Sequence, residues 1–326
     1  MRACQSRDQA PKECSIEQKR TLPGSAVSAP HVMPALRITH ETLYQYHRPV
    51  RFGPHRLVLR PREGHDLQVE RMTLTIEPEF SIEWSRDVFG NSVAVVEFLR
   101  EAMDLRIVSQ VDIRRGEMPR LAERSSILVG YPLVYDQLET TVAAAYLVSI
   151  YPEETAAVAA WANTAIIPAD VANVVSIVST LNEAVKQQIR YNRREEKGVQ
   201  SPLETLRRGT GSCRDMATLL MEGCRALGIA SRFSSGYLDC VASLAGNAST
   251  HAWAEAYLAG RGWTGFDPTL GEQTSGKHIA IGLSNHPRGV MPISGRFYGT
   301  SADCIGMTVA VKFEMEQSPV IEAAAR

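Results

Sequence analysis

The chain has 326 residues, of which 44% are hydrophobic and 22% charged, a composition typical of soluble globular proteins with enough apolar material for two packed units. Lys and Arg total 35 against 36 Asp and Glu, and no basic run is interleaved with aromatic residues, which argues against nucleic acid or a membrane as partner. Six cysteines without a CxxC pair argue against a disulfide framework and against zinc or redox chemistry, so we expect a cytoplasmic protein.

The first 34 residues mix polar side chains and prolines without periodicity, and we expect a disordered extension over 1–34. Met33 lies just before the first patterned segment and is an alternative start to Met1. From there, segments at 36–46, 67–76, 92–98 and 103–113 have β-branched or period-two character and are separated by turn residues such as Gly90 and Asn91. We predict an N-terminal antiparallel β-sandwich-like domain over 35–130.

The periodicity then changes to that of helices, which predicts a helical part over 131–200 with helices at 153–166 and 171–192. A core over 201–315 should follow, in which an amphipathic helix begins at Cys213 and stops at Gly228. Strands are expected at 231–238, 251–258, 263–267 and 307–313, and a flexible tail at 316–326. The fold class is therefore α+β, with Cys213 at a helix N-terminus against an antiparallel sheet.

Cys213, His251 and Asp267 follow one another in the order that a cysteine acyl-transfer triad needs. A thiol is a useful nucleophile only as the thiolate, which a helix N-terminus and a neighbouring imidazolium both favour. His251 would hold the thiolate and protonate the leaving group, and Asp267 would orient the imidazole ring. The turn-prone residues 259–262 should place Asp267 on the strand beside His251.

Other side chains near these three have weaker claims to a catalytic role. The backbone N–H of Cys213 could donate to an oxyanion, and Tyr191 and Gln200 are candidates for a second donor that the sequence cannot place. Glu255, on the strand of His251, is better explained as a structural carboxylate. Cys224 is expected to pack in the core, and Asp215 to make contacts at the helix start.

Four segments of the chain resemble sequences of the bacterial transglutaminase-like superfamily. The first is Gly-Ser-Cys-Arg-Asp-Met-Ala at 211–217, and the others are 226–238, 250–258 and 262–269. The resemblance extends upstream to Tyr-Gln-Tyr at 44–46 and to 53–63, which look like the N-terminal β domain of the same proteins. It implies a papain-like core whose Cys-His-Asp triad falls on Cys213, His251 and Asp267. Calcium-binding acidic loops of the animal enzymes are not recognisable, so no metal or other cofactor is expected.

The family includes cross-linking enzymes, peptidases and amidases, so the resemblance implies thiol acyl chemistry more firmly than it implies one product. We expect a thioester acyl-enzyme formed from a peptide or isopeptide amide of a peptide or protein substrate, resolved by water. Transfer to an amine, as in a transglutaminase, is the alternative. A binding scaffold without catalysis and an arylamine N-acetyltransferase-like reaction with acyl-CoA are two further alternatives. The oligomeric state is not predicted.

Overall fold

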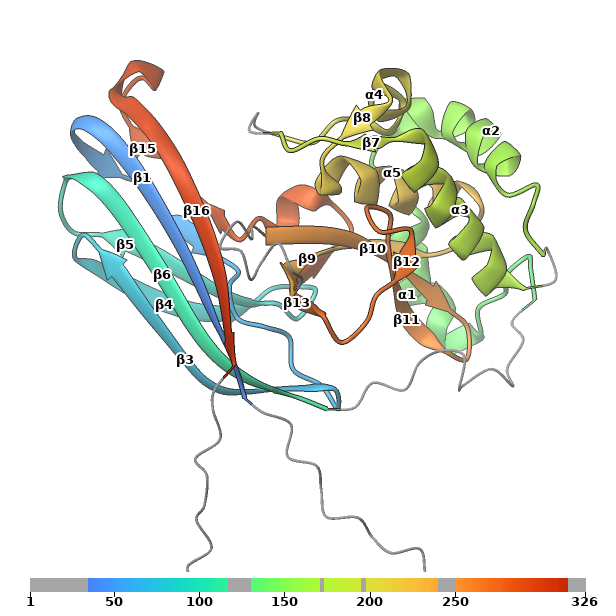
Figure 1. Ribbon diagram of the computed structural model, residues 1–326, viewed down its shortest axis with the longest axis horizontal. Coiled ribbons are helices and arrows are strands. Elements are labelled where there is room, and N and C mark those ends of the chain that lie inside the picture. The colour runs from blue at the N-terminus through green and yellow to red at the C-terminus, as the bar shows by residue number, and fades with distance from the viewer. Residues whose placement is uncertain (1–34, 117–129, 171–172, 195–197, 240–249, 316–326) are drawn as a thin grey trace, which may run out of the picture. The chain divides into compact units, whose positions relative to one another are not determined.

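The computed structural model describes residues 35–116, 130–170, 173–194, 198–239 and 250–315. The expected extension at 1–34 and the expected tail at 316–326 both lie outside these ranges, as does Cys240. The described residues form a β-rich N-terminal region and a mixed core (Figure 1), which is the α+β architecture expected from the sequence. No helix in the described ranges is long and apolar enough to cross a membrane.

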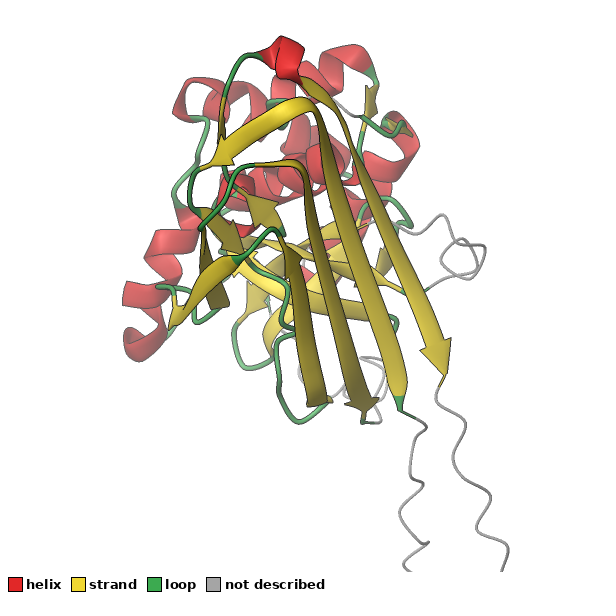
Figure 2. Ribbon diagram, turned by 90° about the vertical axis from the view of Figure 1, so that its left-hand side faces the viewer, coloured by secondary structure: helices red, strands yellow, loops and turns green. Residues whose placement is uncertain are grey.

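The N-terminal region consists of two antiparallel sheets, and Figure 2 shows the long strands of the first sheet side by side. In the first sheet β6 lies between β3 and β1, and β1 also pairs with β15 and β16. The second sheet has the order β14-β2-β5-β4. The strands are β1 (Leu36–Phe52), β2 (His55–Leu57), β3 (Leu67–Glu77), β4 (Phe80–Arg86), β5 (Ser92–Phe98), β6 (Ala102–Arg115), β14 (Ile293–Ser294), β15 (Phe297–Tyr298) and β16 (Cys304–Met315).

The last described strands belong to the N-terminal sheets, although the sequence analysis placed them in the core over 201–315. β16 pairs with β1 from Leu36 opposite Met315 to Tyr46 opposite Cys304. Val311 and Phe313 of β16 are buried in the same apolar cluster as Leu36 and Ile38. A period-two pattern predicts a strand, but it does not identify the sheet that the strand joins. The prediction that 201–315 is all core is therefore wrong for β14, β15 and β16.

The helices occupy the predicted part of the chain with shifted ends. The expected helix at 153–166 is a 3₁₀ turn, η2 (Pro152–Glu154), followed by α2 (Thr155–Ala165), and the expected helix at 171–192 is α3 (Val174–Gln188). Asn173 caps α3 by accepting a hydrogen bond from the backbone N–H of Val175. A further helix, α1 (Gln137–Leu147), has little apolar periodicity and was not predicted. The remaining helical elements are α4 (Pro202–Arg208), α5 (Cys213–Ala226), η3 (Pro287–Val290) and η4 (Ser301–Asp303).

The core sheet is antiparallel with the order β12-β11-β10-β9-β13, and α5 packs against β9 and β10 (Figure 1). Its strands are β9 (Ser231–Leu238), β10 (Thr250–Leu258), β11 (Gly262–Asp267), β12 (Glu272–Gln273) and β13 (His278–Ser284). Met216, Leu219 and Leu220 of α5 are fully buried, as their spacing predicted. Two short parallel strands, β7 (Arg190–Tyr191) and β8 (Thr210–Gly211), lead into α5.

The opposite face of the core sheet packs on the N-terminal region through a shared apolar cluster. Tyr237 of β9 and Ile279 and Ile281 of β13 are buried against Leu36 and Ile38 of β1 and their neighbours. Polar contacts fix the same junction. The Asn91 side chain donates to the carbonyl of Leu283 at 2.7 Å and accepts from its N–H at 2.9 Å. The core sheet thus packs against α5 on one face and against the N-terminal region on the other, so the core and the N-terminal region form a continuous packed unit.

Candidate active site

Cys213 is the first residue of α5, and the residues around it are fixed by Asp215. The carboxylate of Asp215 accepts hydrogen bonds from the backbone N–H of Ser212 at 2.8 Å, from the backbone N–H of Gln200 at 2.8 Å and from Arg194 at 2.9 Å. Asp215 is 1% exposed and completes a capping box with Ser212. Its contacts are those of the helix start, as predicted, and they hold the Cys213 backbone N–H at the positive end of the helix dipole.

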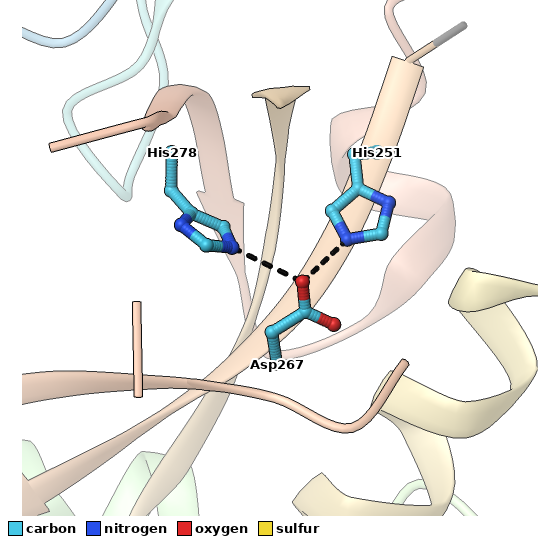
Figure 3. A group of neighbouring side chains, drawn as sticks. All are labelled: His251, Asp267 and His278. Carbon is cyan, nitrogen blue, oxygen red and sulfur yellow. Dashed lines mark hydrogen bonds and ion pairs between the residues drawn. The ribbon is translucent and has the colours of Figure 1, made fainter. Parts of the chain in front are cut away.

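The hairpin of β10 and β11 brings His251 and Asp267 together, which confirms the contact expected from the sequence. Ala254 pairs with Phe266, so Asp267 lies close to His251 along the adjacent strand. Nε2 of His251 lies 2.7 Å from Oδ2 of Asp267 (Figure 3). On its other side His251 has Cys213, which lines the same cavity and interacts with the imidazole closely enough to raise its pKa. The three residues therefore form one chain of contacts from thiol to imidazole to carboxylate.

The electrostatics of this contact chain favour a charged imidazole. Burial opposes the imidazolium, but the hydrogen bonds and charges of Asp267 and Cys213 outweigh it and raise the pKa of His251 from 6.5 to about 10. Burial also opposes the charged form of Asp267, yet hydrogen bonds from His251, His278 and Thr269 hold the pKa of Asp267 well below its usual range. At neutral pH the site therefore holds an imidazolium on a carboxylate, next to Cys213.

A second histidine contacts the same carboxylate, and the sequence reasoning missed it. Nε2 of His278 lies 3.0 Å from Oδ2 of Asp267 (Figure 3), while Nδ1 of His278 accepts the backbone N–H of Ser275 at 3.1 Å. Because Nδ1 is an acceptor, the ring proton is on Nε2, and His278 donates it to Asp267. His278 begins β13, which was not predicted either. The alternation of His-Ile-Ala-Ile at 278–281 was the available signal.

The other oxygen of Asp267 is held by Thr269. Oδ1 accepts the backbone N–H of Thr269 at 2.9 Å and its hydroxyl at 2.5 Å. One ligand atom from each of His251, Asp267 and His278 also lies within 4.8 Å of the others, a spacing that could hold a metal ion. Two ring N–H donors on one carboxylate oxygen account for the same spacing without a cation. The donor set thus fits a hydrogen-bonded orienting carboxylate.

Cys213 and His251 open into a cavity of about 210 Å³ between the start of α5 and the first strand of the N-terminal region. Its described wall comprises His40, Thr42, Tyr44, Tyr191, Arg193, Arg194, Ser212, Cys213, Arg214, Phe233, Ser235, Thr250, His251, Ala252, Pro287, Val290, Met291, Pro292, Ile293, Met307 and Val309. Several of these come from β1 and β16, which lie far from the triad in sequence. The N-terminal region therefore supplies one wall of the site.

The cavity distinguishes between the two candidates for a second oxyanion donor. Tyr191 lies in the cavity wall, and burial together with the charge of Cys213 raises the pKa of its hydroxyl. Gln200 is 3% exposed, and its side-chain oxygen accepts the Thr205 hydroxyl at 3.2 Å. Gln200 is not part of the wall, so the structure does not bring it to the site. Tyr191 is the candidate that remains.

The residues expected to be structural are engaged away from the thiol. Glu255 pairs with Arg232 at 2.8 Å, outside the cavity wall. Cys224 is buried in the core, where burial raises the pKa of its thiol to about 12. Trp253 is 2% exposed and packs edge-on against His278, with ring centroids 5.2 Å apart. Trp253 therefore contacts the rings of both His251 and His278.

Comparison with known proteins finds a matching family model for each of two segments of the chain. Residues 36–114 match the family model of the bacterial transglutaminase-like N-terminal region, and residues 165–268 match that of the transglutaminase-like superfamily. An uncharacterized protein of Mycobacterium tuberculosis is 26% identical over 283 residues, which cover 82% of this chain and 89% of that protein. An uncharacterized protein of Mycobacterium leprae is 30% identical over 115 residues, or 34% of this chain and 40% of that protein.

A solved structure extends the likeness over most of the fold. A protein of Cytophaga hutchinsonii, provisionally assigned as a cysteine protease, superposes with a TM-score of 0.66 over 88% of this chain and 93% of its own. The two chains are 19% identical, so the likeness concerns the fold. The combination of N-terminal β region and papain-like core thus recurs as one arrangement.

Proposed function

Because the chain belongs to the transglutaminase-like superfamily, we propose that it transfers acyl groups from peptide or isopeptide amides through a thioester on Cys213. The observation that carries the proposal is the position of His251, which lines the cavity together with Cys213 and contacts Asp267 at 2.7 Å on its other side. A base oriented by a third group, next to a thiol at a helix N-terminus, is the arrangement that activates a cysteine nucleophile.

In the first step the Cys213 sulfur attacks the amide carbonyl carbon. The carbonyl oxygen becomes an oxyanion, for which the backbone N–H of Cys213 and the hydroxyl of Tyr191 are the donors we assign. The C–N bond then breaks as the His251 imidazolium gives its proton to the departing amine. Asp267 keeps the ring oriented throughout, and His278 and Thr269 keep Asp267 oriented.

In the second step a water molecule attacks the thioester carbon and gives one proton to His251. The C–S bond breaks, which releases a carboxylic acid and restores the pair of Cys213 thiolate and His251 imidazolium. We assign water as the acceptor, as expected from the sequence. An amine acceptor would make the protein a transglutaminase. Incubation with a dansyl-amine and a glutamine-rich protein tests this point, since a Cys213-dependent covalent label would replace the hydrolytic assignment.

Selective alkylation tests the catalytic proposal against the alternative of a non-catalytic scaffold. At pH 5.5 an ordinary thiol is almost entirely protonated, whereas a thiolate paired with imidazolium remains reactive. We expect iodoacetamide to modify Cys213 at least about 100-fold faster than the half-buried Cys304, as followed by peptide mass spectrometry. Replacement of His251 by Asn should remove the difference. Equal rates at Cys213 and Cys304 would rule the enzyme proposal out.

A further inference from the structure

The cavity wall beside Cys213 is cationic. Its described residues include Arg193, Arg194 and Arg214 but no Asp or Glu. Arg194 is neutralised by the buried carboxylate of Asp215 at 2.9 Å. His40 adds no charge at neutral pH, because burial lowers its pKa to about 4. Apart from the His251 imidazolium, Arg193 and Arg214 therefore carry the net positive charge of the described wall.

Both arginines line the cavity into which Cys213 opens. Arg214 directly follows Cys213 at the start of α5, where the helix dipole adds to its charge. Arg193 lies two residues after Tyr191, beyond the end of β7. The positive charges of Arg193 and Arg214 counter the rise in the pKa of the Tyr191 hydroxyl, while the charge of Cys213 contributes to that rise. The two guanidinium groups thus share one electrostatic environment with the nucleophile and the assigned oxyanion donor.

Within the described residues, no ion pair is formed by either guanidinium. Most other arginines of the described ranges have a carboxylate within 4.0 Å, for example Arg232 with Glu255 and Arg225 with Glu222. Arg214 is half-buried, whereas Arg193 is exposed at the rim of the wall. A partly buried cation favours an anionic ligand, because the lower local dielectric strengthens the attraction. A guanidinium can bind a carboxylate through two parallel N–H donors.

Much of the remaining cavity wall is apolar. Its side chains come from the segment around η3 and from β16, and they are Pro287, Val290, Met291, Pro292, Ile293, Met307 and Val309. The volume of about 210 Å³ is below the roughly 300–1,000 Å³ of pockets that enclose drug-sized ligands. The site therefore suits one or two residues of an extended chain that carry both a negatively charged group and an aliphatic portion.

We propose that the acyl donor carries a free carboxylate close to the scissile amide, that Arg214 and Arg193 bind this carboxylate, and that its aliphatic portion packs on the wall formed by η3 and β16. An isopeptide whose amide is formed through a side-chain carboxyl group, with the α-carboxylate left free, has this chemistry. The inference rests on the proposed function, since it names the substrate class of the same site.

Two alkylating reagents of nearly equal size test the inference, because iodoacetate carries the carboxylate and iodoacetamide does not. In both reactions the thiolate sulfur forms a bond to the methylene carbon and iodide leaves. The rate constant for iodoacetate at Cys213 is divided by that for iodoacetamide, and this ratio is divided by the same ratio for free cysteine. The result is the selectivity of the site for the carboxylate. We expect this selectivity to exceed about ten-fold, equivalent to 1.4 kcal/mol of differential binding.

Variants distinguish the contribution of the two arginines to this selectivity from that of the His251 imidazolium, which also attracts an anion. Arg214→Gln should lower the selectivity by about three- to ten-fold, and Arg193→Gln by a smaller factor, because Arg193 is exposed and its charge is screened more by water. Arg207→Gln, at an exposed position of α4 outside the cavity wall, is the matched control and should leave the ratio unchanged.

The outcomes distinguish the two proposals. A fast reaction of Cys213 with both reagents, but a ratio that neither arginine variant alters, would overturn the carboxylate inference and leave the thiol chemistry intact. No acceleration of Cys213 over Cys304 with either reagent would overturn both. A selectivity that falls in Arg214→Gln but not in Arg207→Gln would support the inference. Matched N-acetyl-glutamate γ-anilides with a free or amidated α-carboxyl group then extend the comparison to turnover.

Discussion

His278 donates its Nε2 proton to the Oδ2 atom of Asp267 at 3.0 Å, the same oxygen that His251 contacts at 2.7 Å. The carboxylate thus has two imidazole partners on one oxygen and Thr269 on the other. His278 does not line the cavity and its ring tautomer is fixed by Ser275, so we regard it as a positioning residue that acts through Asp267. This second histidine makes the orientation of the Asp267 carboxylate depend on β13.

Replacement of His278 tests this positioning role. His278→Leu removes one donor from Asp267 and should lower kcat/KM by about ten-fold, or about 1.4 kcal/mol of transition-state stabilisation, mainly in kcat. His278→Gln retains an N–H donor and should recover part of the loss, which a role in packing alone would not allow. His47→Leu, at an exposed position of β1, is the control. Equal activities of the Leu and Gln variants would contradict the positioning role.

The low pKa of Asp267 predicts a specific loss of stability in acid. Its folded-state pKa lies below the usual 3.8, so its contribution to the free energy of unfolding is fully present above about pH 5 and is lost as the pH falls below 3.8. Asp267→Asn cannot titrate and should show a shallower decline of that free energy between pH 5 and 3. Urea denaturation at a series of pH values measures both slopes, and parallel curves would contradict the assignment.

The buried ion pair of Glu222 and Arg225 should contribute more to stability than an exposed pair. Their side chains are 3% and 1% exposed and their charged atoms lie 2.7 Å apart. Glu222→Ala leaves the arginine buried without its carboxylate and should lower the free energy of unfolding by about 3–5 kcal/mol. Glu204→Ala breaks the exposed pair with Arg208 and should cost about 0.2–1 kcal/mol. Similar midpoints of chemical denaturation for the two variants would contradict this expectation.

Gly236 lies where β9 approaches β13 closely, so it should not tolerate a side chain. A Cβ atom there would overlap the carbonyl oxygen of Ile279 and the ring of Trp253. Gly236→Ala should therefore lower the free energy of unfolding by about 1–3 kcal/mol and weaken the β13 support of His278. Gly306→Ala, where a Cβ atom has open space, is the control. Equal thermal midpoints would show that β13 shifts without cost.

Removal of divalent cations should not affect activity. Two ring N–H groups already satisfy Oδ2 of Asp267, so the cluster of His251, Asp267 and His278 needs no cation to hold its geometry. We expect kcat/KM to be the same before and after dialysis against EDTA. Added Zn²⁺ should inhibit, because imidazole and carboxylate are zinc ligands and would be taken from the thiol. Loss of activity in EDTA that only a metal restores would replace the hydrogen-bonded interpretation.

The sequence by itself determined the elements that carry the nucleophile and its partners. The apolar spacing of Met216, Leu219 and Leu220 specified the buried face of α5, and Ser212 with Asp215 specified its start. The turn after β10 limited the return strand to a few registers, so Asp267 could be placed beside His251. These are local patterns, in which side-chain periodicity and capping act within one element or one hairpin.

Only the tertiary structure decided what surrounds the triad. β13 and β16 join their sheets through partners far away in the chain, and a strand pattern carries no information on its distant partner. For that reason the sequence could not show that His278 reaches Asp267 or that Met307 and Val309 face Cys213 across a cavity. The backbone around β7 likewise placed Tyr191, rather than Gln200, in the cavity wall. The chemistry at the thiol follows from local sequence, whereas the shape and charge of the cavity follow from long-range packing.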